Sequence, residues 1–300
     1  MRSPAGKLAA PQTPPNSCDC HVHVIGPREQ FPFSDDRAYT PMEANVAMLC
    51  NMAKGTSMER HVLVQPSIYS TDNRCLLAAL ETLGEKRARG VVVVDETIEL
   101  AEIDHLQRCG VRGLRLNLKS NGTPNCRAVE TAIASAVKIA ERHNWHIQLF
   151  MPSEGLCALA DQLLALPVPI VLDHFGLLSP HQKDEATFST IRQLLESGNC
   201  WVKLSGTYRI AKTPTHPDLG KLARQLFAIN GDRCVWASDW PHTPKHNGKS
   251  NQDLGEKPYQ SIDTVGLVRD ALGWLSPDDS VRLFRDNPKI LYDFEDQERH

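Results

Sequence analysis

Residues 18–24 read Cys-Asp-Cys-His-Val-His-Val, a short apolar run that contains two histidines, at positions 21 and 23. Seven further apolar runs rich in valine, isoleucine and leucine follow it along the chain. Continuous runs of this length are typical of strands that are buried on both faces of a parallel sheet. The eight predicted strands are 18–24, 60–65, 89–95, 112–118, 145–150, 169–174, 201–205 and 233–239.

Amphipathic segments separate the apolar runs. Helical patterns occur at 75–85, 98–109, 127–143, 154–166, 188–197 and 219–229. This alternation predicts right-handed βαβ crossovers, and eight strands of this kind can close a (β/α)8 TIM barrel. We expect one α/β domain over residues 17–300, preceded by a flexible Pro- and Ala-rich arm at 1–16. A doubly wound open sheet is the competing fold, but no glycine-rich phosphate turn follows the first strand.

The composition is that of an ordinary globular protein, with 41% hydrophobic and 23% charged residues among 300. A net charge of −3 and scattered basic residues argue against nucleic-acid binding. We expect no membrane association, because the sequence contains no long apolar segment and no apolar signal core. The nine cysteines include no CxxC pair, so we expect reduced thiols and a cytoplasmic protein.

Two connections are longer than the others, at 25–40 and 243–261, and both are rich in Pro, Gly, Asn and charged residues. Each follows the C-terminal end of a predicted strand, which in a barrel is the catalytic face. We expect them to form lids or walls that contact a substrate. Plain surface loops are the alternative.

Polar residues at strand ends are informative, because a buried strand normally ends in apolar groups. His21 and His23 are two residues apart, so their rings lie on the same face of a strand. His174 ends the sixth strand and Asp239 ends the eighth. Such a cluster can bind one metal ion or a substrate anion, and an aspartate among histidines can accept a proton from water. A capping or turn aspartate is the structural alternative for Asp239.

Six motifs, in this order, carry a resemblance to a known family: HVHVIGP (21–27), VLVQPSIYSTDN (62–73), RGLRLNL (112–118), IVLDHFG (170–176), WVKLSGTYR (201–209) and WASDWPH (236–242). Over residues 16–294 the chain resembles the amidohydrolase-related (amidohydrolase 2) family, the group that includes 2-pyrone-4,6-dicarboxylate lactonase, sulfomuconolactone hydrolase and galactarolactone isomerase. The resemblance implies a distorted (β/α)8 barrel. It also implies that Asp239 is the general base that activates water, while His21, His23 and His174 polarise a lactone carbonyl and stabilise the oxyanion.

The resemblance further implies which residues bind the substrate. Arg115 and Arg209 match arginines that hold substrate carboxylates, and Tyr39 and Ser67 occupy substrate-contacting positions. An arginine inside an apolar strand, as at position 115, needs an anionic partner, since guanidinium groups make paired hydrogen bonds with carboxylates. Structural salt bridges are the alternative for both arginines.

The chain departs from the pyrone lactonase pattern at two substrate-contacting positions. Phe150 replaces a tyrosine, and Asn121 stands where that enzyme has another arginine. This difference favours a substrate with one carboxylate, or one whose second acidic group is held differently, with Lys119 nearby to supply charge. His242 either supports the site or belongs to a turn.

Whether the site binds a metal ion also depends on position 150. Many zinc enzymes of the wider superfamily take a histidine from the end of the fifth strand, where this chain has Phe150, which cannot bind metal. His146 lies at the opposite end of that strand, and Gln148 would be an unusual ligand. We therefore favour no cofactor. A single zinc ion on His21, His23, His174 and Asp239 is the alternative.

Taken together, these features predict a hydrolase that opens a small carboxylated lactone in the catabolism of aromatic compounds or sugar acids. The alternatives are a lactone isomerase, a zinc-dependent decarboxylase of the same fold, or a barrel that binds an organic acid without turnover. The natural substrate and the oligomeric state are left open.

Overall fold

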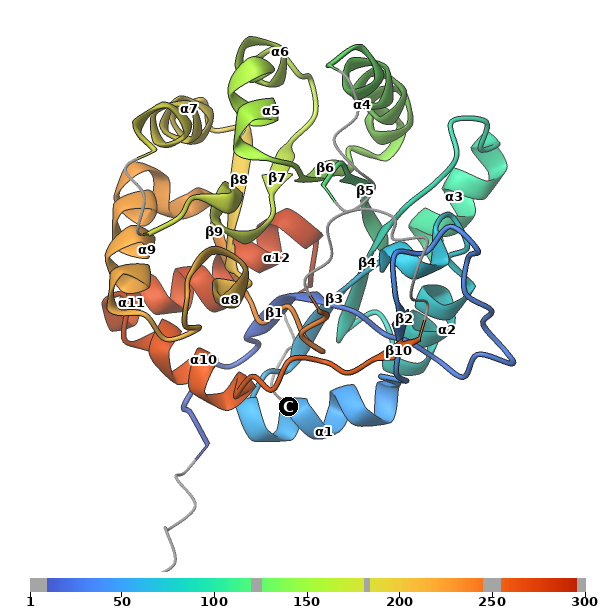
Figure 1. Ribbon diagram of the computed structural model, residues 1–300, viewed down its shortest axis with the longest axis horizontal. Coiled ribbons are helices and arrows are strands. Elements are labelled where there is room, and N and C mark those ends of the chain that lie inside the picture. The colour runs from blue at the N-terminus through green and yellow to red at the C-terminus, as the bar shows by residue number, and fades with distance from the viewer. Residues whose placement is uncertain (1–9, 120–125, 181–183, 245–254, 296–300) are drawn as a thin grey trace, which may run out of the picture.

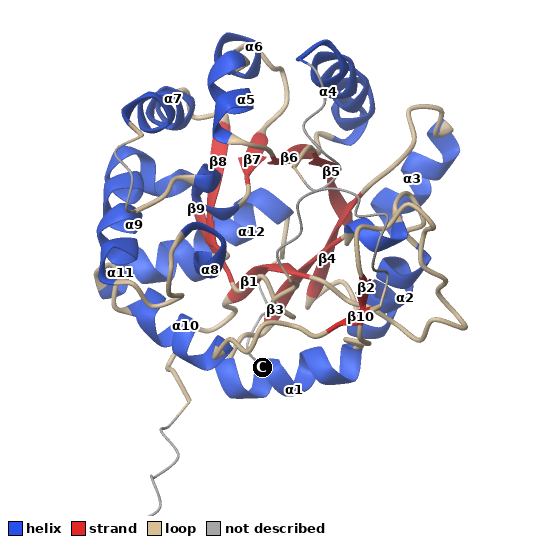
Figure 2. Ribbon diagram, in the orientation of Figure 1, coloured by secondary structure: helices blue, strands red, loops and turns tan. Residues whose placement is uncertain are grey.

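A computed structural model describes residues 10–119, 126–180, 184–244 and 255–295 of the chain. Its centre is a parallel sheet whose eight strands follow one another in chain order, surrounded by a ring of helices (Figures 1 and 2). The strands are β1 (Cys18–Val22), β3 (Arg60–Val64), β4 (Ala88–Val92), β5 (Val111–Asn117), β6 (His146–Phe150), β7 (Ile170–Leu172), β8 (Cys200–Ser205) and β9 (Cys234–Ala237). The sheet closes where the His23 amide donates to the Trp240 carbonyl at 2.8 Å. The predicted single-domain TIM barrel and all eight of its strands are confirmed.

The six predicted helical segments are also present, although the segment at 154–166 is divided into two helices at Leu159. The corresponding helices are α2 (Arg74–Leu83), α3 (Leu100–Arg108), α4 (Cys126–Ala140), α5 (Ser153–Ala158), α6 (Ala160–Leu164), α7 (Glu185–Glu196) and α9 (Pro217–Asn230). Five further helices were not predicted: α1 (Val46–Thr56), α8 (Thr207–Ile210), α10 (Thr264–Leu272), α11 (Pro277–Val281) and α12 (Asn287–Tyr292). Two of these carry recognisable start signals, because Asn45 caps α1 and Ser276 caps α11.

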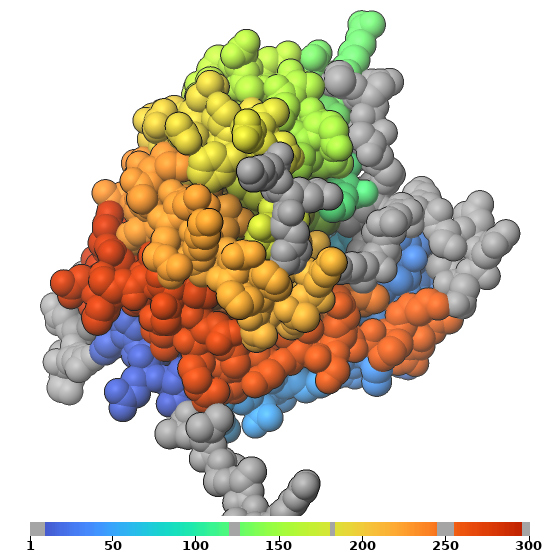
Figure 3. Space-filling view, turned by 60° about the vertical axis from the view of Figure 1, so that its left-hand side comes forward, coloured from blue at the N-terminus to red at the C-terminus, as the bar shows by residue number. Residues whose placement is uncertain are grey.

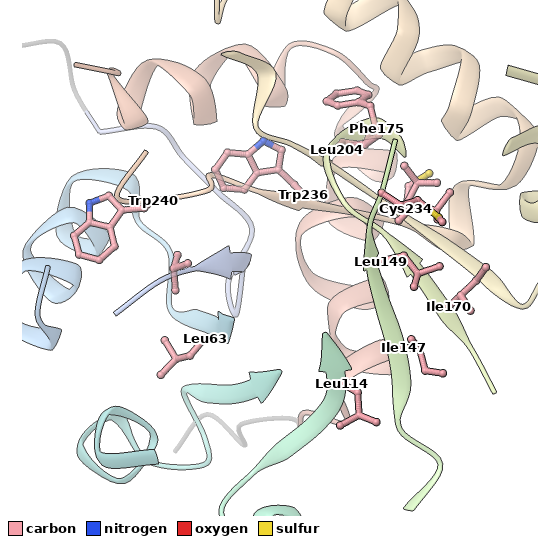
Figure 4. Close-up of a cluster of buried hydrophobic side chains, with 14 of the residues drawn as sticks. Leu63, Leu114, Ile147, Leu149, Ile170, Phe175, Leu204, Cys234, Trp236 and Trp240 are labelled. Carbon is pink, nitrogen blue, oxygen red and sulfur yellow. The ribbon is translucent and has the colours of Figure 1, made fainter. Parts of the chain in front are cut away.

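The apolar core has two parts. The larger part lies between strands and helices, and Figure 4 shows some of its members, including Leu114, Ile147 and Trp236. The smaller part fills the barrel interior and comprises Cys18, Cys20, Val62, Val64, Val91, Val171, Trp201, Val235, Ala237, Tyr292 and Phe294. Tyr292 and Phe294 contact residues at the starts of strands, so the C-terminal segment closes the N-terminal end of the barrel. In the space-filling view, the orange-to-red C-terminal segment also borders the blue N-terminal segment (Figure 3).

An irregularity in β1 sets the direction of the two histidines. Cys18 and Cys20 belong to the interior core, whereas Val22 belongs to the outer core. The register of β1 against β3 shifts between Asp19 and Val22, as in a β-bulge. The shift changes which alternate residues face inward, so that His21 and His23 point into the barrel. Their predicted placement on one face is confirmed.

The two long connections meet each other. The first ends in β2 (Thr40–Pro41) and the second contains β10 (Glu256–Lys257), and the two short strands pair in parallel (Figure 1). The Tyr259 hydroxyl also donates to the Met42 carbonyl. The described ends of both connections are therefore joined into one wall.

Within the described residues, no helix is long and apolar enough to cross a membrane. Of the predicted N-terminal arm, residues 10–16 have no regular secondary structure, and the Thr13 hydroxyl donates to the Ser57 carbonyl at 2.8 Å. Residues 1–9 lie outside the described part.

Among the described residues, the fold buries six histidines, and burial lowers the pKa of each. The pKa falls to about 3 for His23, His61 and His146, to about 4 for His174 and His242, and well below 6.5 for His21. A group whose pKa is lowered by folding contributes stability above its unfolded pKa, and this contribution is lost as the pH falls through its folded value. These histidines therefore make the fold sensitive to acid.

We expect the melting temperature to fall steadily as the pH is lowered from about 6.5 to about 4. Asp19 opposes this trend, because burial raises its pKa to about 6, so its contribution is present at low pH and is lost as the pH rises through that value. The six histidines together change the stability over this pH range more than the single aspartate does. Calorimetry should show a shallower decline for His146→Leu, which removes one titrating ring at the start of β6, the end opposite Phe150. A melting temperature that stays constant over this range would contradict the expectation.

Candidate active site

Asp239 lies in a buried cluster at the C-terminal ends of β1, β7 and β9. Its Oδ1 is 3.8 Å from Nε2 of His21 and 3.7 Å from Nε2 of His23. Its Oδ2 is 3.9 Å from Nε2 of His174. The structure thus brings together the four residues that we predicted to be catalytic, and all four are buried.

Left-handed backbone conformations at the strand ends place two of these side chains. Asp239 has φ +65°, a value that Asp and Asn tolerate better than most residues, and its amide donates to the His21 carbonyl at 3.0 Å. Gly206, with φ +55°, follows β8 and packs against the ring of His174. A Cβ at this glycine would lie 2.5 Å from Nδ1 of His174, so only glycine fits there.

A hydrogen bond at Nδ1 fixes the protonation of His23, which directly follows β1. Nδ1 of His23 lies 2.7 Å from the Val64 carbonyl, which can only accept, so this nitrogen must donate. Nδ1 of His21 is 3.3 Å from Oδ1 of Asp173. Burial alone would raise the pKa of Asp173, but His21 and the Lys203 ammonium hold it well below its usual range. His23 therefore presents a lone pair at Nε2, which lies 3.3 Å from Nε2 of His21.

The two oxygens of Asp239 have different surroundings. Oδ2 accepts from the Tyr208 hydroxyl at 2.6 Å and from Nε of Arg209 at 2.5 Å, and Arg209 also donates to Thr243 at 2.8 Å. Oδ1 has no hydrogen-bond partner among the described residues. Burial would raise the pKa of Asp239, but the Arg209 guanidinium holds it well below its ordinary value. The site therefore contains an ionised carboxylate with one oxygen available for a proton or a cation.

A second polar layer lies below the histidines. Lys203 is fully buried, and its ammonium donates to the Cys20 carbonyl at 2.8 Å and to Oε1 of Gln148 at 2.6 Å. The Gln148 amide donates to Oδ2 of Asp173 at 3.1 Å, and the ammonium is 3.9 Å from Oδ1 of the same carboxylate. Burial lowers the pKa of Lys203 to about 8. We refer to Lys203, Gln148 and Asp173 as the supporting layer, because it holds the carboxylate that orients His21.

The sequence analysis did not name Lys203, Asp173 or Tyr208 as site residues. Lys203 carries the same signal that singled out Arg115, namely a charged residue within an apolar strand. Asp173 directly precedes His174 in the sequence. Nothing in the sequence marks Tyr208, because its contact with Asp239 depends on the turn that follows β8.

A pocket of about 20 Å³ adjoins the cluster, which is room for about one water molecule. Its lining comprises His23, Tyr39, Pro66, Ser67, Arg115, Asn117, Phe150, His174, Arg209 and Thr243. Five of the six predicted substrate-binding residues are in this lining, and the sixth, Asn121, lies outside the described residues. The lining includes Tyr39 and Thr243, so the described ends of both long connections reach the site.

Arg209, Lys119 and His242 each make different contacts near the pocket. Arg209 binds Asp239 directly, so any contact it makes with a substrate carboxylate is shared with this ion pair. Lys119 lies over the ring of Phe150, with its ammonium 5.6 Å from the ring centroid. His242 packs edge-on against Tyr208 and hydrogen-bonds to Thr264 at 2.7 Å, which places it behind the pocket.

The donor set fits a single divalent metal ion. Ligand atoms of His21, His174 and Asp239 lie within 4.8 Å of one another. Nδ1 of His23 donates to the Val64 carbonyl, which leaves its Nε2 oriented for coordination as in many metal sites, and Nδ1 of His21 lies 3.3 Å from the Asp173 carboxylate. The cluster could therefore bind a metal ion. No other group of three or more potential ligands occurs in the part of the chain that the structure describes.

A (β/α)8 barrel with histidines from its first and sixth strands and an aspartate from its eighth, all at the C-terminal end, defines an enzyme of the amidohydrolase superfamily. The comparison with protein families agrees, since the model described as Amidohydrolase matches residues 18–294. The chain belongs to this family.

The named relatives are only distantly similar to this chain in sequence. The 4-sulfomuconolactone hydrolase of Hydrogenophaga intermedia is 30% identical, over 93% of this chain and 89% of that protein. The 2-pyrone-4,6-dicarboxylate hydrolase of Comamonas testosteroni is also 30% identical, over 93% and 90%. The D-galactarolactone isomerase of Agrobacterium fabrum is 25% identical, over 78% and 76%. A solved Agrobacterium tumefaciens structure shares the fold, with a TM-score of 0.78 at 21% identity over 97% of this chain and 99% of that one.

Proposed function

We propose that the protein is a hydrolase that opens a small carboxylated lactone, with water activated by Asp239. The observation that carries this proposal is the unpartnered Oδ1 of an ionised, buried Asp239 beside a pocket with room for about one water molecule. Two arginines, the buried Arg115 and the largely buried Arg209, line the same pocket and suit an anionic substrate. The names of two 30% identical relatives, both hydrolases, support this substrate class.

In the proposed reaction, Oδ1 of Asp239 accepts a proton as the water oxygen attacks the lactone carbonyl carbon. Nε2 of His21 and of His23 lie within 4 Å of Oδ1, so an imidazole can take over this proton. The resulting imidazolium stabilises the oxyanion and then protonates the departing ring alkoxide as the C–O bond breaks. An imidazolium on His21 is favoured by the Asp173 carboxylate, whose Oδ1 lies 3.3 Å from Nδ1. The product is a hydroxy acid or its tautomer.

We infer that this reaction proceeds on protein groups alone. If a metal ion were bound, His21, His23, His174 and Asp239 would hold it, and it would supply Lewis-acid polarisation of the carbonyl. Two features favour the metal-free reaction: β6 ends in Phe150, which is no ligand, and the Arg209 guanidinium already neutralises Asp239. A cation beside that guanidinium would be repelled.

Chelation should therefore leave the activity nearly intact. After prolonged dialysis against a strong chelator, we expect kcat/KM for lactone hydrolysis to stay within about twofold, because loss of a catalytic metal ion removes a carbonyl-polarising group and costs far more. Plasma mass spectrometry on the same samples gives the metal content. Activity that declines in proportion to the metal removed, and returns with zinc, would overturn the metal-free proposal.

Isotope labelling tests the reaction type. In H₂¹⁸O, hydrolysis places one ¹⁸O atom in the new carboxylate of the product. An isomerase would yield a lactone without label, and a decarboxylase would release carbon dioxide. An unlabelled lactone product would favour the isomerase alternative, which the similarity to the 25% identical D-galactarolactone isomerase supports.

Arg115 should control affinity for the substrate carboxylate. We expect Arg115→Met to raise KM about ten- to a hundredfold, because a charge-assisted pair is lost. The methyl ester of the same lactone, which lacks the charge, should be affected much less. Arg112→Met, on the same strand but paired with Asp293 at the far end, is the matched control. Equal losses for the acid and the ester would indicate a structural role for Arg115.

A further inference from the structure

A second, larger cavity adjoins the reaction pocket. This side chamber has a volume of about 290 Å³ and shares three lining residues with the pocket: Ser67, Arg115 and Asn117. It lies at the C-terminal ends of β3, β4 and β5, where Gln65 and Val93 also line it. The reaction pocket, at about 20 Å³, is far too small for a lactone, whereas the chamber is close to the size range of small-molecule sites. The body of a substrate can therefore lie in the chamber while its carbonyl faces Asp239.

Gln65 gives the chamber a definite hydrogen-bonding preference. This side chain is fully buried, and its amide nitrogen donates to the Asp72 carbonyl at 2.8 Å and to the Ser70 carbonyl at 3.3 Å. Carbonyls only accept, so these two contacts fix which end of the amide is the oxygen. That oxygen, Oε1, is buried without a hydrogen-bond partner in the structure. It requires a donor, which a hydroxyl group can supply and a carboxylate cannot.

The charged residues around the chamber also favour hydroxyl groups over a carboxylate. Of the described residues, Arg115 is the only basic one in the lining, and its guanidinium already lies 3.9 Å from Asp173 and donates to the Gln65 carbonyl at 2.8 Å. Nε of Arg115 has no acceptor and can donate to a neutral oxygen. The other charged lining residue, Asp36, is an anion, and the remaining polar side chains are neutral. Within the part of the chain that the structure describes, the lining therefore offers no second cation for a second carboxylate.

We propose that the side chamber is the subsite for the part of the substrate remote from the scissile carbonyl, and that this part bears hydroxyl groups rather than a carboxylate. This inference rests on the proposed function and restricts the substrate class to hydroxylated lactones. The substrate is then a hydroxylated lactone with one carboxylate, which the arginines of the reaction pocket hold. A lactone with a second carboxylate in this position would leave Gln65 Oε1 unpaired and would place a second anion in a lining that already contains Asp36.

Three lactones test this preference in the intact protein. D-glucaro-1,4-lactone has one carboxylate and several hydroxyls, muconolactone has one carboxylate and no hydroxyl, and 2-pyrone-4,6-dicarboxylate has two carboxylates. We expect kcat/KM to be highest for the first, by about tenfold or more over each of the others, as one buried hydrogen bond predicts. A preference for the dicarboxylate would overturn the inference while leaving the proposed function standing. Absence of Asp239-dependent hydrolysis of all three would overturn the proposed function itself.

Gln65→Met isolates the contribution of Oε1. Since the same amide anchors the loop at Asp72, this variant can slow every substrate, so the informative quantity is the ratio of kcat/KM between the glucarolactone and muconolactone. We expect this ratio to fall about tenfold, to near one. An unchanged ratio would contradict the proposed contact.

Val93→Lys is a gain-of-function test that does not depend on Gln65. It introduces a cation into the chamber, and we expect kcat/KM for the dicarboxylate to rise about tenfold relative to muconolactone. Val94→Lys is the matched control, since Val94 is the next residue and does not line the chamber. The same shift in both variants, or no shift in Val93→Lys while its melting temperature is preserved, would count against the subsite.

Discussion

Asp239→Asn should lower kcat for lactone hydrolysis by about a thousandfold, within the range that loss of a general base usually costs. Asparagine keeps the shape of the side chain and tolerates the positive φ of this position, and its oxygen can still accept from Tyr208. It cannot, however, take a proton from water. We therefore expect KM and the melting temperature to change much less than kcat.

The matched control is Asp19→Asn, which alters another fully buried carboxylate near the end of β9. Oδ1 of Asp19 accepts from the Ser238 amide at 2.9 Å, and this residue does not line the pocket. We expect this variant to retain activity within a few-fold. If Asp239→Asn also stayed within about tenfold of the wild type, another group would have to be the base.

Lys203→Met should destabilise the fold by about 3–5 kcal/mol, the usual cost of removing one partner of a buried ion pair. The substitution leaves Oε1 of Gln148 without its donor and Asp173 without the nearby ammonium. For a chain of this size, we expect the melting temperature to fall by about 10 °C. Thermal unfolding measured by calorimetry gives both quantities.

A double-mutant cycle separates this pairing from simple packing. Asp173→Asn alone removes the carboxylate that orients His21, so it should lower kcat about tenfold or more. Adding Asp173→Asn to Lys203→Met removes the uncompensated charge, and part of the lost stability should return. Strictly additive losses of stability would show that Lys203 and Asp173 do not act as a pair.

The barrel itself was predictable because its strands are continuous apolar runs, and buried parallel strands leave just this trace in a sequence. His21, His23, His174 and Asp239 could be grouped for a related reason, since each is a polar residue at the end of such a run. Helices α1 and α10 occupy regular positions after β1 and β9, but each is separated from its strand by one of the two long connections, and both went unrecognised.

Other parts of the site depend on tertiary contacts that no local pattern encodes. The β-bulge in β1 reverses which residues face inward, and two-residue spacing alone does not reveal it. The contact between Arg209 and Asp239 likewise arises from the turn after β8, so the residue that we expected to bind substrate also binds the proposed base. The supporting layer could have been found by treating Lys203 as Arg115 was treated.

The pairing of β2 with β10 has a consequence for protein engineering. Strand pairing transmits displacement through backbone hydrogen bonds, so a change of length or direction in one connection is passed to the other. Loop grafts from relatives should therefore transfer 25–41 and 243–257 as a matched set. Chimeras that exchange only one of these segments would join two edges with mismatched registers, and we expect them to lose substrate discrimination before they lose the barrel.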